Sequence, residues 1–234
     1  MSEEISGLMK TLRHGSDSWL LLFDIDGTLV DTGGKGMAAL RKTAVEVFGG
    51  DGPPLDLAGS TDLGILENLY IHFEVDATAE RTHRFFDVYH RHLEASLESK
   101  PAEGRVLDGV IELLEELAVN ENAQLALLTG NTSLGAEMKL RHYGLGHHFT
   151  FGAFGSDRAD RNQLGPIAME RALAITGRIY HPERTLVIGD TPKDIACAHA
   201  LGARCLAVAT GQFSEDQLEK AGADWVLGSL RDLL

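Results

Sequence analysis

Short apolar runs alternate with segments of helical spacing along most of the chain. Residues 19–23 are apolar at every position, which is typical of a strand buried on both faces of a parallel sheet. Further strands are expected at 123–130, 184–190, 204–210 and within 224–234, and helices at 110–120, 132–145, 192–203 and 214–223. This alternation predicts an α/β fold with a mostly parallel sheet and helices on both faces.

One stretch, between the first strand and residue 104, departs from this alternation. It shows helical spacing at 36–49, 61–73 and 77–98, with no convincing strand. We therefore expect a core made of residues 19–32 and 104–234, and an inserted helical domain at 33–103. Glycines near residues 33–36 would give the first hinge its backbone freedom.

Residues 1–18 have little apolar periodicity and end in turn-prone residues. They are expected to form an N-terminal tail or a short helix. No function is assigned to them.

The composition excludes several classes of protein. The formal net charge of −14 at pH 7 opposes binding to nucleic acid or to an anionic membrane. Cys197 and Cys205 are too few for a disulfide framework and lack the spacing of a zinc site. No apolar run is long enough for a transmembrane helix, and the N-terminus lacks the apolar core of a signal peptide. We expect a cytoplasmic protein, either a monomer or a weak homodimer.

Polar side chains follow three of the expected strands, at the point where each one ends. They are Asp24 and Asp26, then Thr129 and Asn131, and then Asp190, with Asp194 one helical turn later. Ligands of parallel sheets bind at the carboxyl ends of the strands, and side chains two apart in a strand share a face. Several carboxylates would then converge, which is unfavourable unless they are protonated or neutralised by a divalent cation. Oxygen-only ligands favour Mg²⁺.

A Mg²⁺ ion beside a free carboxylate suits phosphoryl transfer, in which an aspartate can be the nucleophile. Asp24 would attack phosphorus, while Asp26 would protonate the leaving oxygen and then activate water. The Thr129 hydroxyl and the backbone amides at Gly130 and Asn131 would hold the phosphoryl oxygens. A lone Asp-x-Asp is more often a turn or a solvated pair, but the polar ends of the other two strands favour the catalytic interpretation.

These segments resemble three motifs of the haloacid dehalogenase superfamily, in its phosphoglycolate phosphatase-like branch. The motifs are FDIDGTLVDT at 23–32, LLTGN at 127–131 and VIGDTPKD at 187–194. The resemblance implies a Rossmann-like core, a mobile helical cap at 33–103, a bound Mg²⁺ and an aspartyl-phosphate intermediate on Asp24. It also implies metal contacts from Asp24, from the backbone carbonyl of Asp26 and from Asp190, with Asp194 contributing directly or through water.

The third motif of the family is a lysine, and the corresponding stretch at 155–177 contains none. Arg161 lies at a suitable distance from the fourth motif and is expected to supply the missing positive charge. Arg158 is the second candidate, and the alternative is that both arginines are solvated. An arginine offers a planar fork where a lysine offers a compact charge, so the geometry at the nucleophile would have to adapt.

Three cap residues are candidate substrate contacts. The segment LAGSTD at 57–62 resembles the specificity loop of the family, which favours Ser60 and Thr61. A helix N-cap at either residue is the alternative. Lys35 would meet an anionic substrate, unless it is simply a solvated lysine.

Together these residues predict a Mg²⁺-dependent phosphatase that hydrolyses a small, phosphoglycolate-like phosphomonoester. A phosphomutase of the β-phosphoglucomutase type is the nearest alternative, and a non-catalytic binding module of the same fold is another. Dehalogenation is disfavoured because Asp26 is present, and phosphonate cleavage would require Lys35 as the cap lysine.

Overall fold

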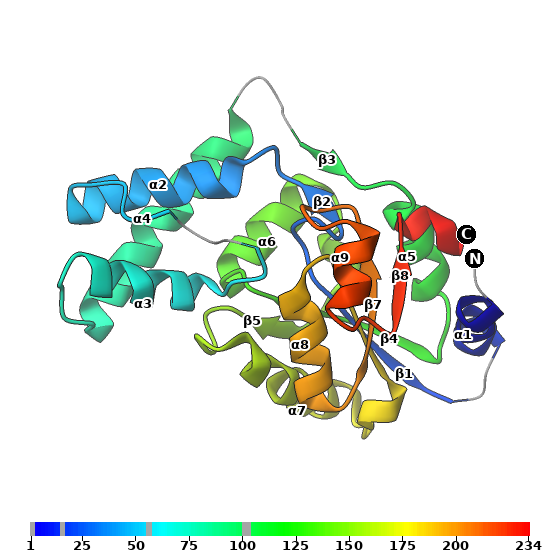
Figure 1. Cartoon of the computed structure of the whole chain (residues 1–234). Helices are drawn as coiled ribbons and strands as arrows, with labels where there is room; N and C mark the ends of the chain where they lie inside the picture. The colour runs from blue at the N-terminus through cyan, green and yellow to red at the C-terminus, as the bar shows by residue number, and fades with distance from the viewer. Residues whose placement is uncertain (1–2, 15–16, 55–57, 100–103) are drawn as a thin grey trace.

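The computed structural model describes residues 3–14, 17–54, 58–99 and 104–234. Across these residues six strands form one parallel sheet, in the order β5-β4-β1-β6-β7-β8 (Figure 1). The strands are β1 (Trp19–Phe23), β4 (Ala123–Thr129), β5 (Gly152–Phe154), β6 (Thr185–Gly189), β7 (Arg204–Val208) and β8 (Trp225–Leu227). The expected α/β fold is confirmed.

The strand β1 lies inside the sheet because it is apolar on both faces. Leu21 and Phe23 pack into one hydrophobic cluster, and Leu20 and Leu22 pack into another. β4 and β6 flank β1 in parallel. The carboxyl ends of these three strands therefore meet at one edge of the sheet, where ligands of such folds bind.

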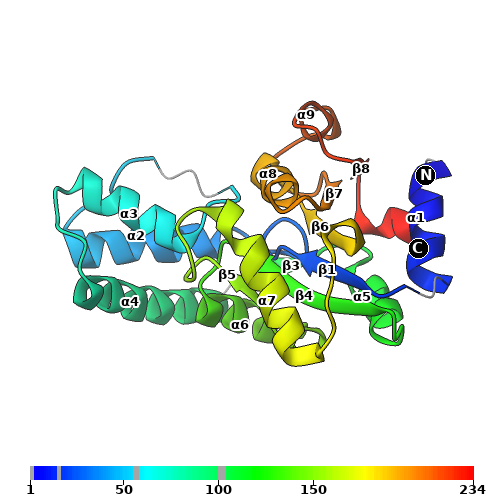
Figure 2. The ribbon, with the colours of Figure 1, turned by 90° about the horizontal axis from the view of Figure 1, so that it is seen from below.

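Helices cover both faces of the sheet, as Figure 2 shows. The face of Leu21 carries α1, α5, α6 and the 3₁₀ turn η4, and the face of Leu20 carries α7, α8 and α9. Their bounds are α1 (Glu3–His14), α5 (Val110–Ala118), α6 (Ser133–His142), α7 (Leu164–Thr176), α8 (Pro192–Leu201), α9 (Glu215–Lys220) and η4 (Leu230–Leu233); the other 3₁₀ turns are η1 (Gly146–His148), η2 (Arg161–Gln163) and η3 (Pro182–Arg184).

Of the two expectations for residues 1–18, the structure has the helix, α1. Its buried residues Ile5, Met9 and Leu12 follow helical spacing and join the core. Arg13 forms an ion pair with Glu116 of α5. The few apolar residues of this segment are thus enough for a short helix to pack against the core on the same face of the sheet as α5.

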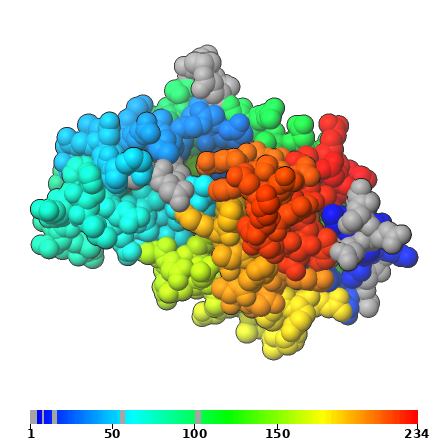
Figure 3. Space-filling view, in the orientation of Figure 1, coloured from blue at the N-terminus to red at the C-terminus, as the bar shows by residue number. Residues whose placement is uncertain are grey.

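Three helices form the cap: α2 (Lys35–Phe48), α3 (Asp62–His72) and α4 (Ala79–Glu98). They enclose a hydrophobic cluster of their own that includes Leu66 and Phe85. Met138 of α6 belongs to the same cluster, so the cap packs against the core at that helix. Figures 1 and 3 show the cap extending to one side of the core.

A short antiparallel pair lies where the chain enters and leaves the cap. It joins β2 (Val30–Asp31) to β3 (Arg105–Val106). The boundaries expected at 32/33 and 103/104 fall beside this pair. Residues 100–103 lie outside the described chain, so the second boundary stays a prediction.

Besides β2, β3 and the 3₁₀ turns, the core contains a strand and a helix that were not expected from the sequence. β5 has only three residues and begins with Gly152, which leaves little strand signal. α7 buries Leu164, Ala168 and Ala172 at helical spacing, a pattern that can be read from the sequence. No helix among the described residues is long and apolar enough to cross a membrane.

Candidate active site

Asp24 and Asp26 leave the end of β1 toward different partners. The Asp24 N–H still continues the sheet by donating to Ile188 O at 2.9 Å. The backbone then turns around the carbonyl of Ile25, which accepts three later N–H groups. The Asp26 carboxylate accepts hydrogen bonds from Lys139 Nζ at 2.8 and 2.7 Å. The two side chains line the same cavity but have different partners, because the strand has already begun to turn.

The Asp24 carboxylate lies close to those of Asp190 and Asp194. Oxygens of Asp24, Asp190 and Asp194 lie within 4.8 Å of one another, and all three residues are buried. Burial raises the pKa of Asp24 to about 6; Arg161 opposes this rise and Asp194 adds to it. Burial also raises the pKa of Asp190 well above its usual value, with Asp194 and Asp24 adding to the rise. Bringing these charges together is costly without a further cation.

The turn after β1 is built to approach Asp190 closely. Gly27 has φ of 80°, and a Cβ atom at this position would collide with the Asp190 carboxylate. Thr28 Oγ1 donates to Asp190 Oδ1 at 3.2 Å. The glycine and threonine of the Asp-Gly-Thr sequence therefore pack the loop against the end of β6.

The Asp194 carboxylate has protein partners at both oxygens. Its Oδ2 accepts from the N–H and the hydroxyl of Thr191, at 3.0 and 2.7 Å, in the capping box that begins α8. Its Oδ1 accepts from Arg161 Nη2. Asp194 therefore holds Arg161, and Asp24 and Asp190 are the carboxylates of this cluster that line the pocket.

Arg161 reaches the centre of the site. Its Nη2 lies 3.3 Å from Asp24 Oδ1 and donates to Leu128 O at 3.2 Å, while Nη1 donates to Gly59 O at 3.1 Å. Burial lowers the pKa of this guanidinium, but Asp194 and Asp24 outweigh burial and raise it, so Arg161 stays charged. The position next to Asp24 supports the role predicted for it.

Arg158, the second candidate for this role, is exposed. Its Nη1 donates to the carbonyl of Asp157 at 2.7 Å. It is not among the residues that line the pocket.

Lys139 of α6 is a site residue that the sequence analysis missed. It is buried, and its Nζ donates to Asn131 Oδ1 at 2.6 Å as well as to both oxygens of Asp26. A weak signal was present in the sequence, because Lys139 is three residues after Ala136 and four after Gly135, and so shares their buried face of the helix. A lysine on such a face needs an anionic partner.

Thr129, Gly130 and Asn131 come together at the end of β4. The fully buried Thr129 hydroxyl accepts from Asn131 Nδ2 at 2.8 Å, and Asn131 Nδ2 also donates to Asp26 Oδ2 at 2.8 Å. Gly130 and Asn131 line the pocket, but Thr129 does not. In this structure Thr129 positions Asn131, and its contact with phosphate stays a prediction.

The three predicted cap contacts take different positions. Ser60 lines the pocket and accepts a hydrogen bond from Lys193 Nζ at 2.7 Å. Thr61 is the N-cap of α3, as in the alternative, and donates to Ala159 O at 2.5 Å. Leu57, the first residue of the expected loop, lies outside the described residues.

The structure places Lys35 away from the pocket. Its buried Nζ donates to Leu97 O at 3.1 Å and to Ser99 O at 3.2 Å, at the C-terminal end of α4. This geometry does not support Lys35 as a substrate contact, nor as the lysine of phosphonate cleavage. Its position is not that of a solvated lysine either, because the side chain stabilises the end of a helix.

Asp62, the first residue of α3, is a second pocket residue that the sequence analysis missed. Its N–H donates to Gly130 O at 2.7 Å, and its Oδ2 accepts from Thr132 N at 2.8 Å. A Cβ atom at Gly130 would collide with the backbone of Ser60. The glycine in the second motif therefore lets the cap loop dock on the core.

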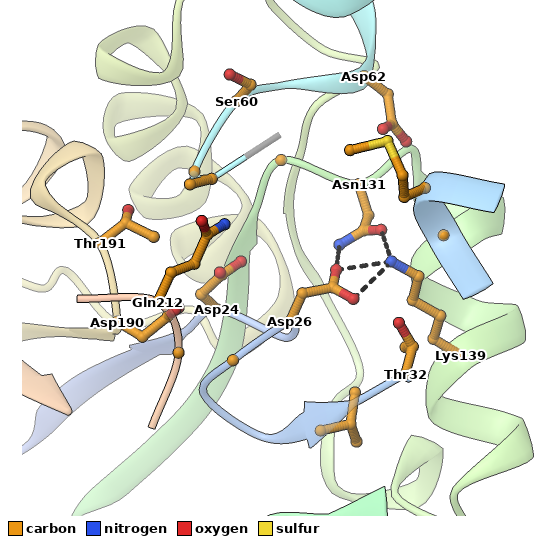
Figure 4. A pocket seen from close by; sticks show the side chains of 18 of the residues that line it. Asp24, Asp26, Thr32, Ser60, Asp62, Asn131, Lys139, Asp190, Thr191 and Gln212 are labelled. Atoms are coloured by element: carbon orange, nitrogen blue, oxygen red, sulfur yellow. Dashed lines mark hydrogen bonds and ion pairs between the residues drawn. The ribbon is translucent and has the colours of Figure 1, made fainter. Parts of the chain in front are cut away.

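The resulting cavity lies between cap and core and has a volume of about 540 Å³. Figure 4 shows Asp24 and Asp190 on one side of it, and Asn131, Lys139 and Asp62 on the other. The Asp26 carboxylate stands between these groups.

Comparison with known families identifies the family of the chain. The family model described as haloacid dehalogenase-like hydrolase matches residues 21–208. The chain belongs to this family. As a haloacid dehalogenase-like hydrolase it is an enzyme by family, and its three recognised motifs lie at the ends of β1, β4 and β6.

Individual relatives agree with this assignment. Phosphoglycolate phosphatase 1 of Pseudomonas aeruginosa is 27% identical over 223 residues, which cover 92% of this chain and 78% of that protein. A hydrolase from Pseudomonas syringae has a structure that matches with a TM-score of 0.68 and 25% identity, over 92% of this chain and 96% of the other. CbbY from Rhodobacter sphaeroides, solved in complex with phosphate, matches with a TM-score of 0.71 and 21% identity, over 92% of this chain and 96% of the other. This match shows the common fold.

Proposed function

We propose that this hydrolase is a Mg²⁺-dependent phosphatase that cleaves a small phosphomonoester through an aspartyl-phosphate intermediate. The observation that carries the proposal is the setting of Asp24. Its carboxylate is buried at the end of the central strand, beside Arg161 and the carboxylates of Asp190 and Asp194. A nucleophile, a fixed cation and an acidic cluster thus meet in one cavity.

The donor groups of this cluster fit Mg²⁺. They are all oxygens, and the raised pKa values of Asp24 and Asp190 support a bound cation, which would favour the ionised form of both. Asp24, Asp190 and the backbone carbonyl of Asp26 would hold the ion, with Asp194 beside them. Bound there, Mg²⁺ would neutralise the charge of the phosphoryl group.

In the proposed reaction, a carboxylate oxygen of Asp24 attacks phosphorus and the bond from phosphorus to the ester oxygen breaks. The leaving oxygen takes a proton from Asp26 and departs as an alcohol. Asp26 then accepts a proton from water, whose oxygen attacks phosphorus. The bond from phosphorus to the Asp24 oxygen breaks, which releases inorganic phosphate and restores the Asp24 carboxylate.

The other groups hold this arrangement in place. Arg161 would stabilise the charge on the phosphoryl oxygens, and the amides at Gly130 and Asn131 would donate to them. The cap, whose loop docks at Gly130, excludes bulk water from the intermediate. Phosphoglycolate, which names the relative from P. aeruginosa, is one candidate substrate.

The test is a panel of phosphomonoesters with and without Mg²⁺, using the native protein, Asp24→Asn and the exposed cap control Asp51→Asn. We expect release of inorganic phosphate only with Mg²⁺, loss of turnover in Asp24→Asn and normal turnover in Asp51→Asn. Near-normal turnover in Asp24→Asn would overturn the mechanism. A rearranged sugar phosphate would indicate the mutase, and no reaction at all would indicate the binding module. A cytoplasmic location and a monomeric or weakly dimeric state remain predictions of the sequence.

A further inference from the structure

The cap forms one wall of the cavity, and in the proposed reaction this wall faces the leaving group. Its apolar lining includes Met37, Leu40 and Ile65, and its polar lining includes Asp62 and Tyr89. A volume of about 540 Å³ falls in the range of pockets that bind whole small molecules. The chemistry of this wall therefore selects what is esterified to the phosphate.

No described cap residue that lines the cavity is cationic. Among the described lining residues the cations are Lys139 and Arg161, both from the core. The three protons of Lys139 Nζ are directed to Asp26 and Asn131, and Arg161 contacts Asp24 and Asp194. A second anionic group on the substrate would find no free positive charge in this part of the cavity.

Two buried residues of the cap wall each have a side-chain oxygen with no hydrogen-bond partner among the described residues. Asp62 is 5% exposed and uses only Oδ2, which accepts from Thr132 N, so Oδ1 is open to the cavity. Tyr89 is 1% exposed, and its hydroxyl makes no hydrogen bond within the described chain. Burial raises the pKa of Tyr89 well above its usual value and Asp62 adds to the rise, so this hydroxyl keeps its proton.

Hydrogen-bond chemistry then distinguishes the possible ligands. A ligand hydroxyl donates one hydrogen bond and accepts others, so it can donate to Asp62 Oδ1 and accept from the Tyr89 hydroxyl. An ammonium group has no acceptor for Tyr89. A carboxylate has no donor for Asp62 and places like charges side by side.

We propose that the leaving group of the substrate is a neutral, hydroxyl-bearing alcohol, as in polyol and sugar phosphates, and that Asp62 and Tyr89 bind one of its hydroxyls. The proposal rests on the phosphatase function proposed above. It places phosphoglycolate, whose leaving group is anionic, among the poor substrates of this enzyme.

The experiment compares kcat/KM for glycerol 3-phosphate and ribose 5-phosphate with that for phosphoglycolate and phosphoethanolamine, all with Mg²⁺. We expect at least one of the two hydroxylated esters to exceed both of the others by tenfold or more. Phosphoglycolate or phosphoethanolamine equal to the better hydroxylated ester would overturn the inference. Failure of every ester, including the activated ester p-nitrophenyl phosphate, would instead overturn the phosphatase function itself.

Variants test the assigned residues. Asp62→Asn and Tyr89→Phe should raise KM for the preferred hydroxylated ester by fivefold or more, while Asp51→Asn, exposed on the cap, should not change it. An unchanged KM in both Asp62→Asn and Tyr89→Phe, with folding checked by circular dichroism, would overturn the assignment. Met37→Lys, which adds a cation to the wall, should raise kcat/KM for phosphoglycolate at least fivefold; no gain, in a variant folded by the same criterion, would count against the inference.

Discussion

Lys139 binds both carboxylate oxygens of Asp26, with Nζ at 2.8 and 2.7 Å. The lysine side chain is 4% exposed, whereas the aspartate side chain is 41% exposed and faces the cavity. Asn131 Nδ2 adds a hydrogen bond of 2.8 Å to the same carboxylate. Asp26, the proposed acid and base of the reaction, is therefore held in position by Lys139 and Asn131 while its carboxylate remains accessible from the cavity.

Replacing Lys139 should slow the step that needs a proton. Lys139→Met removes the buried cation and leaves Asp26 free to rotate, so we expect kcat for an alkyl phosphate to fall at least tenfold. General acid catalysis is worth about 10²- to 10⁴-fold, and p-nitrophenol leaves without a proton. The loss with p-nitrophenyl phosphate should therefore be smaller, which steady-state kinetics on both esters can measure.

The matched control for this variant is Lys42→Met, because Lys42 is exposed on α2 and does not line the cavity. It should behave as the native protein with both esters. Equal losses in Lys139→Met with the two esters would contradict a role in placing Asp26 and indicate general damage to the site.

Arg161 is expected to act as the cation of the phosphoryl site. Arg161→Ala should lower turnover at least tenfold, because it removes the charge next to Asp24 and leaves the buried Asp194 carboxylate without its cationic partner. Arg161→Lys should recover part of the rate, since it keeps the charge but cannot reach both Asp24 and the cap carbonyl of Gly59.

Arg158→Ala is the control for this pair, as it removes an exposed arginine three residues away. Steady-state kinetics with Mg²⁺ should show no effect of this change. An unaffected rate in Arg161→Ala would show that Arg161 has a structural role and does not act on the phosphoryl group.

The sequence predicted several of the side chains that line the cavity at the strand ends, among them Asp24, Asp26 and Asp190, although Thr129 does not line it. The apolar run before Asp24 and the order of the three motifs predicted which side chains meet at one edge of the sheet. Arg161 could be selected because no lysine occupies its region. These features depend on local pattern and on topology, which a single sequence carries.

Contacts made by the face of a helix or by a loop were harder to predict. Lys139 lies in a helix that is also rich in exposed polar residues, so its spacing from Ala136 is a weak signal, and its burial depends on how α6 packs against the cap. In the sequence, Asp62 looks like an ordinary first residue of a helix. Its position in the cavity depends on how the cap packs against the core. Lys35 was misplaced for the same reason, since its partners lie on α4, more than sixty positions away.

A metal ion should stabilise the fold by relieving repulsion between Asp24 and Asp190. Mg²⁺ at a hundred times its dissociation constant should add about 2.7 kcal/mol, and each kcal/mol shifts the midpoint by about 2–4 °C in a chain of this size. Asp190→Asn should raise the melting midpoint of the metal-free protein and reduce its response to Mg²⁺. Differential scanning calorimetry with and without Mg²⁺ measures the melting midpoint and its response to the metal, with Asp51→Asn as the control. A native-like response in Asp190→Asn would contradict the proposed ligand.

Asp62 should make stability fall as pH rises. Burial raises its pKa from 3.8 to about 6, while Lys139 opposes the rise, so the folded protein keeps this proton at pH values where the unfolded chain has lost it. The folded state binds more protons between these two values, and the free energy of unfolding therefore decreases with pH there, by up to about 3 kcal/mol. Asp62→Asn removes this dependence, so its stability relative to the native protein should increase from pH of about 3.5 to about 7. Urea unfolding at both pH values measures the difference, and a relative stability that does not change with pH would show that Asp62 is not held in the buried state described above.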